Sequence, residues 1–295
     1  MAVEDGKMPE FSPDMFRQLV TAREEKWAEM MGQLEPQGYT VVDLREEAGF
    51  TAKLAIKPAK ESGRGIFIVC AGGGFRFKSW NEALPVAEYF YEKGIGVAIL
   101  DYHVGQGEGL NIDPNVNRMA GDDGLEAVRY LRKNAKALGI AEDHIAIGGF
   151  SAGGMLSGYV ATKFDYGDPD TGLVSSRPDA ALILYGAFSA TSGIPAGPGG
   201  LSREQIQQAN ALDNARNIRV DCPPMFVFQT HGDDPRIALN FCMELAVHGV
   251  PYEIHTFEDG PHGGGMYNGL EETPDEPHTA LWPMIAADWL LHKGY

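Results

Sequence analysis

The sequence predicts an α/β protein built on a mostly parallel sheet with helices on both faces. Short runs of apolar residues alternate with amphipathic helical segments from about residue 65 to the C-terminus. Such alternation is typical of parallel strands covered by helices on both sides. A chain of 295 residues that is 44% hydrophobic is long enough for one large domain with a sizeable core.

The expected strands are short and rich in Val, Ile, Leu and aromatic residues. They cover 39–44, 51–56, 65–70, 97–100, 145–147, 180–185, 225–228 and 252–257. The first of them precede the strand–helix alternation, so they can pair antiparallel. The expected helices show apolar residues every three or four positions. They cover 81–93, 122–138, 152–162, 236–248 and 279–292.

Two segments fall outside this alternation. The first 35 residues have a helical pattern with Trp27 and Met30 on the apolar face. We expect 1–38 to be a helical segment that docks on the domain or acts as a lid, and 39–295 to be the α/β domain. The stretch 189–221 opens with a run rich in Gly and Pro and is expected to form a small cap insertion.

The charge excludes several kinds of partner. With 24 Lys+Arg against 41 Asp+Glu, the formal charge of −17 argues against nucleic acid and anionic membranes. No apolar run is long enough to span a membrane, and no secretory signal pattern is seen at the start. Cys70, Cys222 and Cys242 are scattered, which favours buried free thiols in a reducing compartment, hence a cytoplasmic location. A homo-oligomer is left open.

The strongest chemical motif is Gly149-Phe150-Ser151-Ala152-Gly153. It directly follows one expected strand and opens the next helix, which is the context of a nucleophile elbow. The turn is so tight that side chains at 149 and 153 would collide with neighbouring chain. Ser151 is therefore the expected nucleophile, with the helix N-terminus behind it favouring a developing oxyanion.

A glycine run, Gly72-Gly73-Gly74, follows the expected strand that ends at Cys70. Acyl transfer requires backbone N–H groups aimed at the carbonyl oxygen as it becomes negative. Glycines let the chain turn its amides inward and let a substrate approach closely. We expect the oxyanion donors to be the amides of Gly73 and Gly74, together with that of Ala152.

The acid and the base follow later strands. Asp233 and Asp234 come after the strand 225–228, and Asp234 is favoured as the acid because the proline after it fixes the turn, with Asp233 as the alternative. His262 lies on a glycine-flanked loop after the strand 252–257. His231 is its rival, but it precedes the acid and is expected to order its own loop. The resulting order is Ser151, Asp234, His262.

These motifs, together with Asp101-Tyr102 and Asp123-Gly124, resemble the α/β-hydrolase superfamily from about Val41 to the C-terminus. The chain looks most like bacterial esterases and acetylesterases, a group with lipase-like and xylan-deacetylating members. The resemblance implies the α/β-hydrolase fold and a Ser–Asp–His hydrolase that uses no metal or organic cofactor. Many relatives have His before the three glycines, where this chain has Ala71.

The expected function is therefore a serine carboxylester hydrolase. Its substrates would be small-molecule esters with small or medium acyl groups, such as acetyl esters of sugars. The alternatives are a lactonase or a peptidase of the same fold, or a non-catalytic ligand-binding relative. The expected walls of the substrate pocket are the large side chains beside the motifs, namely Phe75, Trp80, Met266 and Tyr267.

Overall fold

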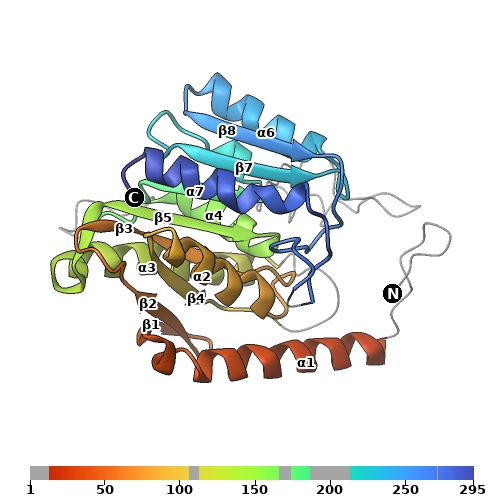
Figure 1. Ribbon diagram of the computed structural model, residues 1–295, viewed down its shortest axis with the longest axis horizontal. Coiled ribbons are helices and arrows are strands. Elements are labelled where there is room, and N and C mark those ends of the chain that lie inside the picture. The colour runs from red at the N-terminus through yellow and green to blue at the C-terminus, as the bar shows by residue number, and fades with distance from the viewer. Residues whose placement is uncertain (1–12, 106–112, 166–173, 187–212, 271) are drawn as a thin grey trace.

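A computed structural model of the protein describes residues 13–105, 113–165, 174–186, 213–270 and 272–295 (Figure 1). The described residues form one eight-stranded sheet in the order β1-β2-β4-β3-β5-β6-β7-β8. Its strands are β1 (Thr40–Glu47), β2 (Phe50–Lys57), β3 (Arg64–Cys70), β4 (Gly96–Asp101), β5 (Ile140–Phe150), β6 (Ala180–Leu184), β7 (Met225–Thr230) and β8 (Tyr252–Phe257).

The sheet is parallel except at one edge. β1 pairs with β2, and β2 with β4, in antiparallel fashion, while the neighbours from β4 through β8 are parallel. The mostly parallel α/β sheet with antiparallel leading strands is thus confirmed. Parallel strands point their carboxyl ends to one edge of the sheet, so the segments that follow β3, β5, β7 and β8 all emerge there.

Helices cover both faces of the sheet (Figure 1). Val128, Leu156 and Phe241 pack on one face, and Phe90 and Trp282 on the other. The helices of the first face are α3 (Pro114–Leu138), α4 (Ala152–Lys163) and α6 (Arg236–Val247); those of the second are α1 (Pro13–Gly32), α2 (Leu84–Glu92) and α7 (Trp282–His292). The short 3-10 turns are η1 (Glu35–Gln37), η2 (Trp80–Glu82), η3 (Asn214–Asn217) and η4 (Thr279–Leu281).

Two elements differ in extent from the expectation. α3 begins at Pro114 rather than at residue 122, because the Asp113 carboxylate accepts the amide of Asn115 and caps the helix there. The expected helix 81–93 is divided, since η2 ends at Glu82 and α2 starts at Leu84. Because of this break, the Glu82 side chain points into the protein interior, where the residue is 2% exposed.

The N-terminal helix is docked on the body of the domain. Trp27 and Met30 of α1 are each 5% exposed, and the Trp27 indole N–H donates to the Asp101 carboxylate at 2.8 Å. Arg23 and Lys26 form ion pairs with Glu272. These contacts hold α1 against the body of the domain, and its role as a docking helix or a lid stays a prediction. Residues 1–12 and most of the expected cap, 187–212, lie outside the described residues.

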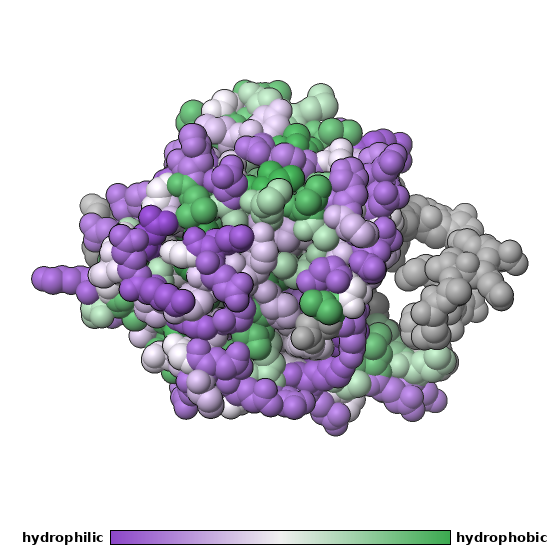
Figure 2. Space-filling model, viewed as in Figure 1, coloured by the Kyte–Doolittle hydropathy of each residue, from purple (hydrophilic) through white to green (hydrophobic). Residues whose placement is uncertain are grey.

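Polar side chains cover most of the face shown in Figure 2, with apolar groups between them. In the part of the chain that the structure describes, no helix is both long and apolar enough to cross a bilayer. Cys70, Cys222 and Cys242 are buried and free, as expected.

Candidate active site

The predicted chemical motifs meet at the carboxyl edge of the sheet. Gly72 follows β3, Ser151 follows β5, Asp233 follows β7 and His262 follows β8. Because these four strands run parallel, loops from distant parts of the sequence come together at one edge.

Ser151 occupies a strained turn between β5 and α4. Its φ is 52° and its ψ −116°, a conformation that non-glycine residues rarely adopt. A Cβ atom at Gly149 would lie 2.2 Å from the Cys70 carbonyl oxygen, and one at Gly153 would lie 2.1 Å from it. Only glycine fits at both positions, as the sequence predicts, and the turn presents the Ser151 side chain at the sheet edge.

His262 bridges Ser151 and a carboxylate. Its Nε2 lies 2.8 Å from Ser151 Oγ, and its Nδ1 lies 2.6 Å from Asp233 Oδ2. A carboxylate can only accept, so Nδ1 carries the proton and Nε2 of the neutral ring accepts from the Ser151 hydroxyl. The loop that carries His262 is held in place by Tyr267, because the Tyr267 hydroxyl donates to the Pro261 carbonyl at 2.7 Å.

The prediction that Asp234 holds His262 is wrong. The Asp234 carboxylate turns the other way and binds the guanidinium and the amide of Arg236, which also holds the pKa of Asp234 below its usual value. Asp233 binds His262 Nδ1 instead, and it also accepts a hydrogen bond from the Gln229 side chain at 3.2 Å. His231, the rival base, has an exposed side chain and does not reach Ser151.

The surroundings of His262 favour its charged form. Partial burial lowers its pKa, but the hydrogen bond and charge of Asp233, together with the charge of Glu82, more than offset this. The pKa of His262 therefore lies above the ordinary value of 6.5. A base with a raised pKa still accepts a proton at neutral pH and stabilises the imidazolium that forms.

The glycine run leaves backbone N–H groups beside Ser151. Gly73 has φ 131° and Gly74 φ 62°, which turn the chain sharply after β3. Within the described residues, the amides of Gly73 and Gly74 have no acceptor, and the Ala152 amide is at the first turn of α4. The Gly72 amide is already engaged, since it donates to Glu82 Oε2 at 2.8 Å.

Glu82 is the site residue that the sequence analysis missed. It lies within an expected helix, where a glutamate is normally solvated. Its burial depends on the break between η2 and α2, and on hydrogen bonds to Gly72 and Tyr185. A glutamate placed eight residues after the glycine run was the available signal, and on its own it is weak.

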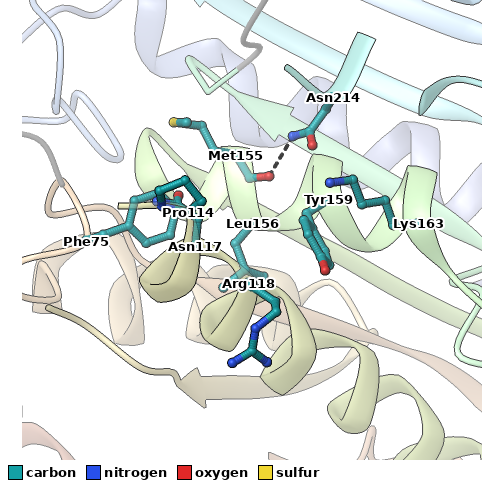
Figure 3. A pocket seen from close by; sticks show the side chains of 9 residues that line it. All are labelled: Phe75, Pro114, Asn117, Arg118, Met155, Leu156, Tyr159, Lys163 and Asn214. Carbon is teal, nitrogen blue, oxygen red and sulfur yellow. Dashed lines mark hydrogen bonds between the residues drawn. The ribbon is translucent and has the colours of Figure 1, made fainter. Parts of the chain in front are cut away.

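A cavity of about 270 Å³ lies in the groove between α3 and α4 (Figure 3), and neither Ser151 nor His262 lines it. Its apolar part is formed by Phe75, which follows the glycine run, and by Met155, whose amide donates to the Ser151 carbonyl one turn back along α4. Its far end is polar, and the Lys163 ammonium lies 4.5 Å from the centre of the Tyr159 ring. The side chains that line it include Phe75, Met155, Leu156, Tyr159, Lys163 and Asn214.

Of the expected pocket walls, only Phe75 lines this cavity. Tyr267 does not line it; the residue is fully buried, and its hydroxyl supports the loop of His262. Met266 is 7% exposed and packs in the core on the other face of the sheet. Trp80 is partly buried beside Lys26 of α1. The sequence places these residues next to the loops but does not tell which face of each loop they occupy.

Comparison with known proteins shows the family and the fold. Residues 81–275, about two thirds of the chain, match the prolyl oligopeptidase family. The crystal structure of an acetyl ester-xyloside bifunctional hydrolase from Caldicellulosiruptor lactoaceticus is similar, with a TM-score of 0.69 and 24% identity. The similarity covers 86% of this chain and 96% of that one, and it shows that the two share a fold.

Two curated proteins are similar in sequence. Endo-1,4-beta-xylanase B of Butyrivibrio fibrisolvens is 26% identical over 211 residues, which are 68% of this chain and 32% of that protein. Acetylxylan esterase of Xylanibacter ruminicola is 26% identical over 132 residues, which are 45% of this chain and 24% of that protein. The chain thus matches a third or less of the length of these relatives.

Proposed function

The chain belongs to the prolyl oligopeptidase family of α/β hydrolases, and from this premise we propose that it is a serine carboxylester hydrolase. The observation that carries the proposal is the unbroken series of contacts from Ser151 Oγ to His262 Nε2 at 2.8 Å and from His262 Nδ1 to Asp233 at 2.6 Å. This is the arrangement that makes a serine hydroxyl nucleophilic near neutral pH.

The first half of the proposed reaction forms an acyl-enzyme. Ser151 Oγ attacks the ester carbonyl carbon while His262 Nε2 takes the hydroxyl proton. The carbonyl oxygen becomes an oxyanion that the amides of Gly73, Gly74 and Ala152 stabilise. His262 then gives its proton to the leaving alcohol as the bond between carbon and alkoxy oxygen breaks.

The second half releases the acid. Water gives a proton to His262 Nε2 as its oxygen attacks the acyl carbon, and a second oxyanion forms at the same amides. When this collapses, Ser151 Oγ leaves and recovers its proton from His262. Asp233 keeps the imidazole in the required tautomer throughout and stabilises its positive charge.

The proposed substrates are esters of small or medium acyl groups, such as acetyl esters of sugars. The cavity supports this, since an apolar end at Phe75 and Met155 suits a short acyl chain or the apolar face of a sugar ring. Lys163 offers a polar group to sugar hydroxyls at the far end, whereas the Asn214 amide already donates to the Met155 carbonyl at 2.8 Å. The names of the relatives, an acetylxylan esterase and a xylanase, agree with a substrate of this class.

The test is hydrolysis of p-nitrophenyl acetate and acetylated xylose by the wild-type protein and by Ser151→Ala. We expect the variant to lose at least about 10⁴-fold in kcat, because no other group supplies the nucleophile. Ser62→Ala is the matched control, since Ser62 is an exposed serine whose side chain contacts only the Gly139 carbonyl. Equal rates for Ser151→Ala and wild type would refute the proposal.

The family match favours a second candidate, a peptidase acting after proline. The same serine, histidine and aspartate would cleave an amide, and the difference lies in the substrate that the pocket accepts. A prolyl p-nitroanilide assayed beside p-nitrophenyl acetate separates the two. A kcat/KM for the peptide substrate above that for the acetyl esters would replace the esterase proposal with the peptidase.

A further inference from the structure

Glu82 lies between the segments that make up the site. It is 2% exposed, and both of its carboxylate oxygens are in use. Oε2 accepts the Gly72 amide at 2.8 Å, and Oε1 accepts the Tyr185 hydroxyl at 2.6 Å. Gly72 begins the turn Gly72–Gly74, here called the oxyanion loop because its amides are the proposed donors, so this bond ties Glu82 to that loop.

Tyr185 extends the connection to the loop of His262. It follows β6 directly, and its hydroxyl oxygen accepts the Gly265 amide at 3.0 Å. Its ring centre lies 5.1 Å from that of His262. The Gly265 carbonyl in turn accepts the Trp282 indole N–H at 2.9 Å, which anchors the same loop to α7.

The carboxylate also acts through its charge. Burial raises the pKa of Glu82 above its usual value, and the bonds from Tyr185 and Gly72 offset only part of this rise by favouring the charged form. The charged groups that Glu82 faces are His262 and Arg23, while Tyr102 and Tyr267 are the other titratable side chains that feel its charge. For His262, the facing charges are Asp233 and Glu82. A buried carboxylate is costly, so its retention here needs a reason beyond packing.

We propose that Glu82 is a positioning residue for ester hydrolysis, which fixes the oxyanion loop and the loop of His262 relative to one another. The inference rests on the proposed function. Through its bond with Gly72, Glu82 sets the direction of the Gly73 and Gly74 amides. Through Tyr185 and Gly265, it sets the position of the His262 ring relative to Ser151. Both positions affect the stabilisation of the transition state more than they affect the binding of the substrate.

The main test is Glu82→Gln, which keeps the shape of the side chain. Its amide oxygen can still accept from Gly72, but its NH₂ can only donate to the Tyr185 hydroxyl, so the direction of that bond is reversed and the Tyr185 proton loses its acceptor. We expect kcat for p-nitrophenyl acetate to fall about tenfold to 10²-fold, as for a small misplacement of reacting groups, with little change in KM.

A pH profile distinguishes a positioning role from a loss of stability, because destabilisation alone does not shift the midpoint of the acid limb of kcat/KM. Glu82 adds negative charge near His262, and removing it disfavours the imidazolium. The acid limb of kcat/KM should therefore move to lower pH in Glu82→Gln. Glu88→Gln is the matched control, because Glu88 pairs with Lys57 and Tyr39 away from the site, and it should keep both kcat and the acid limb.

Tyr185→Phe keeps the test decisive if Glu82→Gln fails to fold. It removes only the hydroxyl that joins Glu82 to Gly265, so kcat should again fall about tenfold at constant KM. The inference would be overturned if kcat of the folded variants stayed within about twofold of wild type. Where Glu82→Gln folds, its acid limb would then also be unshifted.

The rate of Ser151 labelling by a fluorophosphonate separates this inference from the proposed function. No labelling of the wild-type protein would mean that the function itself is wrong. Fast labelling of the wild type with an equal rate in Glu82→Gln would leave the function standing and overturn the positioning role.

Discussion

At the scale of single residues, two adjacent carboxylates before α6 have different surroundings. Asp233 Oδ2 contacts His262 Nδ1 at 2.6 Å, whereas Asp234 is bound to Arg236 at the surface. The turn after β7 points consecutive side chains in different directions. One of them faces the loop that follows β8, and the other faces the first turn of α6.

This difference predicts unequal effects of the same substitution. Asp233→Asn should lower kcat by about 10⁴-fold, because an amide can present its NH₂ to Nδ1 and so favour the wrong tautomer of His262. Asp234→Asn should stay within about twofold of wild type, since exposed ion pairs contribute little. Steady-state kinetics with p-nitrophenyl acetate decide this, and the reverse ranking would restore Asp234 as the acid.

The raised pKa of His262 predicts the pH dependence of activity. The base must be neutral to accept the Ser151 proton, so kcat/KM falls as pH drops through the pKa of His262. Because that pKa lies above 6.5, the midpoint of the acid limb should also lie above 6.5. A limb centred below this value would mean that burial outweighs the charges of Asp233 and Glu82.

At the scale of elements, the turn between β5 and α4 is the most constrained part of the site. Both of its glycines approach the carbonyl oxygen of Cys70 at the end of β3. The nucleophile is thus held by the packing of two neighbouring strands, and the helix that follows has its first amide beside it.

Gly153→Ala tests this packing. A methyl group 2.1 Å from a backbone oxygen forces β3 and α4 apart, which should cost about 1–3 kcal/mol of stability and about 10²-fold in kcat. Gly32→Ala is the control, because a Cβ atom there meets nothing within 4 Å. Urea unfolding and kinetics measure both effects. If Gly153→Ala left both kcat and the free energy of unfolding unchanged, the turn would be less tightly packed than described.

The N-terminal helix makes a separate prediction. Trp27 of α1 is 5% exposed and donates to Asp101, so Trp27→Ala should lower the free energy of unfolding by about 3–5 kcal/mol. Trp27→Phe keeps most of the packing and should lose only about 1 kcal/mol. Thr21→Ala, at an exposed position on the same helix, serves as control. Equal unfolding free energies in Trp27→Ala and wild type would show that α1 is not docked.

These elements also show what the sequence could predict. For the described residues, the apolar runs and helical periods predicted the strands and the main helices, because burial on two faces leaves a strong pattern, although α3 and β5 are longer than expected and the helix 81–93 is divided. The glycine spacing and the strand–turn–helix order likewise identified Ser151 and His262. The choice between Asp233 and Asp234 depended on a turn conformation, and the role of Glu82 depended on three long-range contacts. Neither leaves a periodic signal in the sequence.

At the scale of the whole molecule, the net charge of −17 surrounds the site with a negative field. Such a field lowers the local concentration of anionic ligands and leaves neutral ones unaffected. Lys163 and Arg118 are positive charges that line the cavity, but Arg118 is paired with Glu47 and Asp122, and the protein as a whole is strongly acidic. Neutral esters are therefore the substrates that the overall charge favours.

Ionic strength tests this property. Raising salt from about 50 mM to 500 mM shortens the screening length, so kcat/KM for an anionic ester such as p-nitrophenyl succinate should rise severalfold. The value for neutral p-nitrophenyl acetate should stay constant, which makes it the internal control. A fall for the anionic ester would mean that the local charge of Lys163, and not the overall charge, controls its binding.

The central claim is that Ser151 becomes covalently acylated, and intact-mass spectrometry after reaction with a fluorophosphonate tests it most directly. Ser151 Oγ displaces fluoride from phosphorus, and one phosphonyl group should be added per chain, on the peptide that contains Ser151. Asp233→Asn should be labelled far more slowly than wild type, and Ser151→Ala should not be labelled at all. A label on any other residue, or full labelling of Ser151→Ala, would contradict the account.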